Sequence, residues 1–130
     1  MRPILMTVMA AAIAAAAVSN VAAQDAGPAK VAQTSLGPTL TDAGGKTLYT
    51  FSRDMTGYSN CNGACAAAWP PLAAGADAKA SGDWTIIVRD DGGKQWAYKG
   101  HALYAFSKDA AAGDTSGDGA ENGKWRAAKP

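Results

Sequence analysis

The residues best suited to bind a soft metal are two cysteines and the single histidine of the chain. Cys61 and Cys65 stand four positions apart in the alanine-rich stretch 61–69, which we predict to be a helix that ends at Pro70. Positions i and i+4 of a helix share one face, so both thiols would point the same way. Thiolates select Cu(I), and His101 would be the third ligand of such a copper site. The first prediction for the two cysteines is nevertheless a disulfide, the usual state of a cysteine pair in an exported chain.

A second metal prediction comes from a glycine- and aspartate-rich stretch near the end of the chain. Asp114, Ser116 and Asp118 are followed by a glycine and match the first half of a calcium-binding loop, in which oxygen atoms are the ligands. The second half differs, because Trp125 stands where such a loop has a bidentate glutamate. Glu121 could supply a carboxylate by another route. The alternative is an ordinary turn that binds no metal.

Residues for catalysis are harder to find. The sequence offers one histidine, no recognisable Ser/His/Asp arrangement, no His-Glu-x-x-His motif, no phosphate-binding loop and no paired carboxylates in an apolar setting. General acid-base and nucleophilic mechanisms need such groups, so we expect a protein that is not an enzyme. Catalysis on an envelope substrate stays open, because active sites assemble from residues far apart in the sequence.

One pattern occurs twice and organises the rest of the chain. Leu-Tyr-x-Phe-Ser-(Arg/Lys)-Asp stands at 48–54 and again at 103–109, which marks an internal repeat. Alternate side chains of a strand share a face, so the tyrosine and phenylalanine of each copy would point the same way. The aspartate falls where the strand should end, and it either caps the following turn or binds a metal or a polar partner. The motif residues are Tyr49, Phe51, Asp54, Tyr104, Phe106 and Asp109.

Short strands and glycine turns must position these residues. Asp-x-Gly-Gly-Lys turns at 42–46 and 90–94 precede the two motif copies, and Gly-Gly is typical of hairpins. We predict a mainly β fold, a small antiparallel β domain of two pseudo-repeats with about six strands and one short helix. His101 would lie in an exposed turn. The predicted strands are 36–40, 47–51, 83–89, 94–99, 102–106 and 124–126, the repeats are 36–72 and 83–128, and the single domain is 36–130.

On these motifs the chain resembles a family of small secreted bacterial proteins and lipoproteins defined by a Tyr-x-(Phe/Trp/Tyr)-x-x-Asp repeat. The resemblance extends to the segments 59–72, 96–104 and 113–119. It implies a secreted protein and leaves its activity open, because the function of the family is unknown. Many relatives carry a lipid-anchoring cysteine directly after the signal, whereas the first cysteine here is Cys61, so we expect no lipid anchor. The cysteines with His101 also resemble the copper-binding set of periplasmic thioredoxin-like chaperones, although the alternating strands and helices of that class are missing.

The start of the chain predicts export. Arg2, an apolar run over 4–18 and small residues up to Ala23 form the pattern of a signal peptide over residues 1–23, and the run is too short to span a membrane. Residues 24–35 are predicted to be a flexible N-terminal lead. Removal of Arg2 leaves 11 of the 12 basic residues against 11 acidic ones, so nothing favours binding to nucleic acid. We expect a soluble protein, periplasmic or secreted, with no membrane span in the mature chain.

Two classes of function follow. The first is a non-catalytic structural or binding module of the envelope, with a protein or glycan as partner and no cofactor. The second is a periplasmic metal-binding or redox protein that uses copper or calcium at the residues above. Thiol–disulfide exchange ranks lower, because its usual motif is Cys-x-x-Cys. Large aromatic side chains are predicted to pack between the repeats rather than line a groove, and they include Trp69, Trp84, Trp96 and Trp125.

Overall fold

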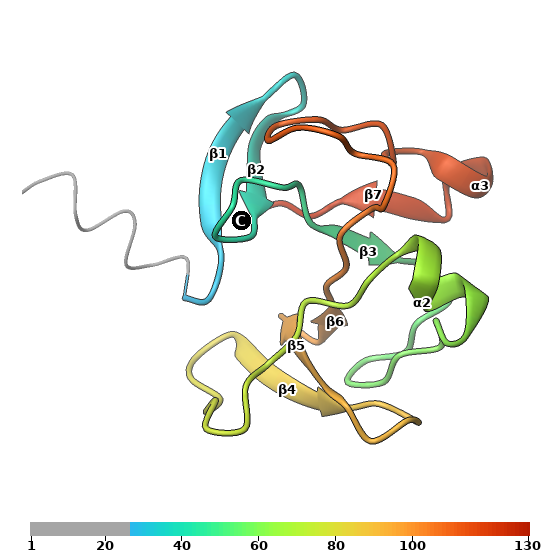
Figure 1. Ribbon diagram of the computed structural model, residues 1–130. Helices are drawn as coiled ribbons and strands as arrows, with labels where there is room; N and C mark the ends of the chain where they lie inside the picture. Colours follow the sequence, from blue (N-terminus) through green and yellow to red (C-terminus); the bar gives the residue numbers. More distant parts are fainter. Residues whose placement is uncertain (1–26) are drawn as a thin grey trace, which may run out of the picture.

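The computed structural model describes residues 27–130 (Figure 1). The predicted signal peptide, residues 1–23, and the first part of the predicted lead lie outside the described residues. In chain order the elements are β1 (Lys30–Thr34), β2 (Gly37–Thr41), β3 (Tyr49–Phe51), α2 (Ala64–Ala68), β4 (Trp84–Val88), β5 (Lys94–Tyr98), β6 (His101–Ala102), α3 (Ala120–Gly123) and β7 (Trp125–Ala127).

Within residues 27–130 the strands form three small antiparallel sheets. β1 pairs with β2, and β4, β5 and β6 form the predicted meander. The third sheet pairs β3 of the first half with β7 near the other end of the chain, so that Phe51 lies opposite Trp125. Figure 1 shows β7 beside β3, with the β1–β2 hairpin and the meander at opposite ends of the molecule. The predicted mainly β, antiparallel class is confirmed.

The folded part begins earlier than the sequence indicated. Residues 30–34 belong to the predicted flexible lead, yet they form β1 and pair with β2 along its whole length. Ala29, just before this strand, is buried with Leu40 and Trp84. Most side chains of β1 are exposed. A strand without a buried face does not need alternating apolar and polar residues, so the pattern that predicts a strand is missing from its sequence. The domain boundary at 36 is corrected accordingly.

The second motif copy is less regular than predicted. The expected strand over 102–106 is reduced to β6, which ends at Ala102. Beyond it, Tyr104 makes single bridges to Tyr49 and to Pro71. The second motif copy therefore bridges two different segments at Tyr104 instead of pairing along one strand.

Helical structure also differs from the prediction. α2 covers Ala64–Ala68 rather than 61–69, because Gly63 enters the helix with a φ of 57° and separates Cys61 from it. Cys61 and Cys65 thus do not share a helix face. A second short segment, α3, lies in the stretch expected to be an irregular turn, and the left-handed backbone angles of Glu121 and Asn122 make it a turn rather than a regular α-helix.

The two motif copies pair with each other around a local pseudo-twofold axis. Tyr49 N donates to Tyr104 O (2.7 Å), and Tyr104 N donates to Tyr49 O (3.0 Å). Equivalent hydrogen bonds recur on either side of this pair, so the repeats are interleaved rather than stacked. Related pairs are Leu72 N to Leu103 O with Ala128 N to Leu48 O, and Ser107 N to Ala68 O with Ser52 N to Lys124 O.

Each motif is preceded by a glycine turn that the other repeat covers. Gly45 and Gly100 both have positive φ (90° and 86°) and stand three residues before the motif leucine. Gly57 N donates to Gly100 O, and Gly113 N donates to Gly45 O. The structural equivalent of the first Gly-Gly-Lys turn is therefore the turn at Gly100, and not the second Gly-Gly-Lys turn at 90–94.

A stack of four aromatic rings crosses the axis. Its order is Phe51, Trp125, Trp69 and Phe106, with centroid separations of 4.2, 3.8 and 4.0 Å. The two central tryptophans are buried, and each outer phenylalanine stacks on the tryptophan of the other repeat. Aromatic side chains bury ~150–250 Å² each, so this stack is a large part of the core and joins the halves. Trp84 and Trp96 pack in a second, smaller core cluster.

Candidate functional site

The tyrosine of each motif copy bonds the aspartate of the other copy. Tyr49 Oη donates to Asp109 Oδ2 (2.6 Å), and Tyr104 Oη donates to Asp54 Oδ2 (2.7 Å). Both tyrosines and Asp109 are buried. The Tyr-x-Phe-x-x-Asp spacing therefore serves contacts between repeats, since a tyrosine does not bond the aspartate of its own copy.

The second oxygen of each aspartate fixes the loop that follows. Asp54 Oδ1 accepts from Asn60 N (2.7 Å), and Asp109 Oδ1 accepts from Ser116 N (3.0 Å). The geometry combines two of the roles that the sequence left open, because each carboxylate caps one backbone N–H group of the following loop and also has a polar partner. That partner is a tyrosine of the other repeat.

Burial sets the protonation of these groups. It raises the pKa of Tyr49 and of Tyr104 well above the ordinary value of a phenol, so both hydroxyls stay protonated donors at neutral pH. Burial also raises the pKa of Asp54 above its ordinary 3.8, and this effect outweighs the hydrogen bonds from Asn60 and Tyr104 that act the other way. These groups are thus held as structural donors and acceptors.

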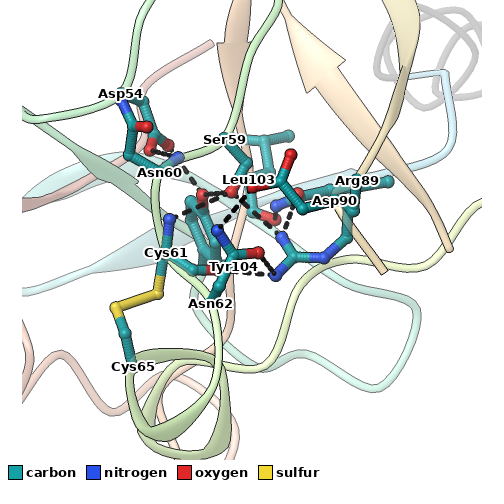
Figure 2. Close-up of a disulfide and its surroundings, with 11 residues drawn as sticks. Asp54, Ser59, Asn60, Cys61, Asn62, Cys65, Arg89, Asp90, Leu103 and Tyr104 are labelled. Atoms are coloured by element: carbon teal, nitrogen blue, oxygen red, sulfur yellow. Dashed lines mark hydrogen bonds between the residues drawn. A yellow bond between two sulfur atoms is a disulfide. The ribbon is translucent and has the colours of Figure 1, made fainter. Parts of the chain in front are cut away.

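A buried arginine organises the segment around the first cysteine (Figure 2). Arg89 Nη1 donates to Ser59 Oγ (3.0 Å) and to Gln95 Oε1 (2.7 Å), while Nη2 donates to Cys61 O (2.5 Å) and to Asn62 Oδ1 (3.2 Å). Arg89 as a whole residue is only 6% exposed, and its guanidinium donates four hydrogen bonds to protein acceptors. The fork therefore clamps the backbone at Cys61.

Two hydroxyls connect this cation to the Asp54 carboxylate. Ser59 Oγ lies 2.5 Å from Tyr104 Oη, which in turn donates to Asp54. Arg89 and Asp54 therefore occupy the two ends of one hydrogen-bonded line. The first repeat lacks this feature, because the position equivalent to Arg89 is Thr34.

Cys61 and Cys65 form the predicted disulfide, with their Cα atoms 5.2 Å apart. Cys61 is fully buried and Cys65 is partly exposed at the start of α2. Asp90 also holds this region, because its carboxylate accepts from Tyr58 Oη (2.9 Å) and from Asn62 Nδ2 (3.3 Å). The hydrogen bond to Asp90 raises the pKa of Tyr58.

A cleft of about 640 Å³ opens beside the disulfide, between the segment after the first motif and α3. Its wall includes Phe51, which is one of the two outer rings of the aromatic stack. Two cations and one anion line it, so its net charge is positive. The residues that line this "Phe51 cleft" are Phe51, Arg53, Asn60, Cys65, Glu121 and Lys124.

Each wall of the Phe51 cleft has a distinctive local feature. Asn60 Nδ2 donates to Arg53 O (2.8 Å), which holds one wall. On the other wall, Glu121 and Asn122 have left-handed φ values of 54° and 62°. Side chains rarely adopt this conformation, which costs on the order of 1 kcal/mol per residue and is concentrated at functional sites. The wall at α3 therefore carries two residues with left-handed backbone angles.

Residues 30–73 and 85–129 match the pattern of one family, described as a secreted repeat of unknown function. The chain belongs to this secreted repeat family. No curated protein and no solved structure gives a significant match. The resemblance inferred from the motifs is confirmed, and each matched segment contains one hairpin and one motif copy. In the described range of this secreted repeat, no helix is long and apolar enough to cross a membrane.

The residues predicted to bind metal are used differently in this secreted repeat. The disulfide leaves neither cysteine as a thiolate, so copper binding there would first need reduction, and His101 is exposed on β6. Asp114 Oδ2 accepts from the backbone N–H groups of residues 110 and 111, and Asp118 Oδ1 accepts from that of residue 127. Ser116 bonds the Asp109 carboxylate. Across residues 27–130 no three His, Cys, Asp or Glu side chains form a group that could hold a metal ion.

Sequence reasoning missed the residues that give this secreted repeat its site. Arg53 and Lys124 are 71 positions apart and meet only because β3 pairs with β7. For Arg89 the sequence predicts only the end of the strand 83–89. One signal was present, because the arginine directly follows the β-branched run 85–88 and precedes a turn.

Proposed function

We propose that this protein is a non-catalytic binding module of the cell envelope, which holds an acidic glycan in the Phe51 cleft. The observation that carries the proposal is the presence of two cationic side chains, Arg53 and Lys124, with the Phe51 ring in one cleft. Carboxylate or phosphate groups of a glycan would bond the cations, and the apolar face of a sugar ring would pack on the aromatic edge.

A non-catalytic role is supported by the state of the acid and base groups. Tyr49 and Tyr104 each bond an aspartate of the other repeat, and burial keeps both hydroxyls protonated. A general acid or base needs to reach the proton that it transfers. These groups instead join the two halves of the core. The cleft offers Glu121 as a carboxylate, with no second carboxylate beside it.

The proposed place of action is outside the cytoplasm. The family is described as secreted, and residues 1–23 have the pattern of a signal peptide. In a host with two membranes the protein would act in the periplasm, where acidic envelope glycans are within reach.

The test is a titration of the exported protein with trigalacturonate, followed by NMR chemical shifts of the backbone amides. The uncharged methyl ester of the same trisaccharide is the matched ligand. We expect shifts at the cleft residues, and weaker binding of the ester. Arg53→Gln and Lys124→Gln should each weaken binding of the acid by about two- to fivefold, as expected for exposed ion pairs.

Lys108→Gln is the matched control variant. Lys108 occupies the position in the second motif copy that Arg53 occupies in the first, and it does not line the cleft. Its substitution should leave the affinity unchanged within about twofold. Equal binding of acid and ester, or equal effects of Lys108→Gln and Arg53→Gln, would contradict the proposed site.

A further inference from the structure

The two sulfur atoms of the disulfide differ in access. Cys61 is 0% exposed and belongs to the core cluster, whereas Cys65 is partly exposed and lines the Phe51 cleft. Figure 2 shows Cys61 next to the Arg89 cluster and Cys65 on the side away from it. A reagent in solution therefore meets Cys65 first.

The direction of attack strengthens this difference. A thiolate attacks a disulfide in line with the S–S bond, from the side opposite the sulfur that leaves. Attack on Cys61 would need an approach through the core. Attack on Cys65 needs an approach from the side opposite Cys61, and of the two cysteines only Cys65 lines the cleft.

The charges of the cleft select the attacking thiol. Arg53 and Lys124 outnumber Glu121 around the opening. A positive cleft raises the local concentration of anions and lowers that of cations. A small thiol that carries an additional negative charge should therefore react fastest.

We propose that the Cys61–Cys65 disulfide exchanges with small anionic thiols and that Cys65 is the sulfur attacked. The thiolate of the small molecule forms a bond to Cys65 Sγ, the Sγ–Sγ bond breaks, and the electron pair leaves on Cys61 as a thiolate. The product is a mixed disulfide on Cys65, with no net oxidation or reduction. Arg89 and Ser59 still hold the backbone of Cys61, so the released thiolate stays in place and the step is reversible.

The experiment compares three thiols of similar size: 2-mercaptoethanesulfonate, 2-mercaptoethanol and cysteamine. The native protein is treated with each, quenched in acid, unfolded and alkylated with N-ethylmaleimide at acidic pH, and mapped by peptide mass spectrometry. We expect the adduct on Cys65 and the maleimide on Cys61. The rate constant, expressed per thiolate, should be about threefold higher for 2-mercaptoethanesulfonate than for 2-mercaptoethanol, and about threefold lower for cysteamine. This is the size of effect expected when one net positive charge of the cleft lies a few ångströms from the charged group of the thiol in water.

Two sets of variants test the charge preference and the site of attack separately. Arg53→Gln combined with Lys124→Gln should abolish the preference for the sulfonate. In single-cysteine variants treated with the disulfide of 2-mercaptoethanesulfonate, Cys61→Ser should be modified at Cys65, and Cys65→Ser should stay unmodified while folded. An adduct on Cys61, equal modification of the two variants, or equal rates for the three thiols would overturn the inference.

This inference uses the same cleft as the proposed function but does not depend on glycan binding. Failed exchange with intact binding of trigalacturonate would refute the exchange alone. Exchange at Cys65 without any glycan binding would refute the proposed function alone.

Discussion

Removal of the Tyr49 hydroxyl tests whether the bonds between repeats stabilise the domain. Tyr49→Phe deletes the donor to Asp109 and the acceptor for Gly117 N, at 2.6 and 3.2 Å, and keeps the ring. Asp109 is 3% exposed, so water cannot replace the lost donor. A hydrogen bond to a carboxylate contributes about 1.5–3 kcal/mol, and an unsatisfied buried N–H costs about 1 kcal/mol. We expect the free energy of unfolding to fall by about 3 kcal/mol.

Tyr104→Phe is the matched change in the other copy. Its hydroxyl bonds Asp54 and Ser59. Asp54 is half-buried, so water can bond its carboxylate, and Ser59 keeps its bond from Arg89. The free energy of unfolding should fall by about 1.5 kcal/mol, half of the effect at Tyr49.

Urea unfolding followed by tryptophan fluorescence measures both losses, and double-mutant cycles assign them. Tyr49→Phe combined with Asp109→Asn should show a coupling of at least about 1 kcal/mol. Tyr49→Phe combined with Asp54→Asn, the aspartate of the same motif copy, should be additive within about 0.5 kcal/mol. Equal coupling energies in the two cycles would refute the assignment of the Tyr49 hydrogen bond to the aspartate of the other repeat. A decrease in the free energy of unfolding below about 0.5 kcal/mol for Tyr49→Phe would refute it as well.

Three further predictions concern pH, the buried cation and the aromatic stack. Burial raises the pKa of Asp54 in the folded protein above 3.8, so protonation of this carboxyl stabilises the folded state. This contribution to the free energy of unfolding is fully present below the pKa of the unfolded chain and is lost as the pH rises through the pKa of the folded protein. Melting temperatures should therefore favour the wild type over Asp54→Asn most near pH ~3 and progressively less above pH ~4, and a constant difference would contradict this. Arg89→Met leaves two buried oxygen acceptors without a donor and should lower the free energy of unfolding by about 3 kcal/mol in urea titrations, with a loss under about 1 kcal/mol as the contrary result. Gly117→Ala would put a methyl group 2.8 Å from the Trp69 ring, so we expect a loss of about 2 kcal/mol and a changed near-UV circular dichroism spectrum. Gly75→Ala, with open space around it, should change neither measurement.

The local features of the fold were predictable because their signals lie within a few residues. The two motif copies, the hairpin between β4 and β5, the final strand β7 and the pairing of Cys61 with Cys65 all followed from residue types and short spacings. β1 was missed because its exposed side chains carry no hydrophobic alternation.

The arrangement between repeats was not predictable in the same way. A Tyr and an Asp at fixed spacing do not reveal which copy of the motif each will contact, and Tyr49 bonds Asp109 rather than Asp54. The Phe51 cleft likewise depends on a pairing of strands far apart in the sequence. Arg53 and Lys124 look like unrelated surface residues until β3 meets β7.

The pairing of β3 with β7 also governs when the chain can finish folding. Leu48 and Leu40 hydrogen-bond Ala128, and Phe51 stacks on Trp125, so the first repeat stays incomplete until the last segment has been synthesised. Contacts this distant in sequence delay folding. The interleaved repeats thereby make completion of the fold depend on residues 125–128, far in the sequence from the strand that they complete.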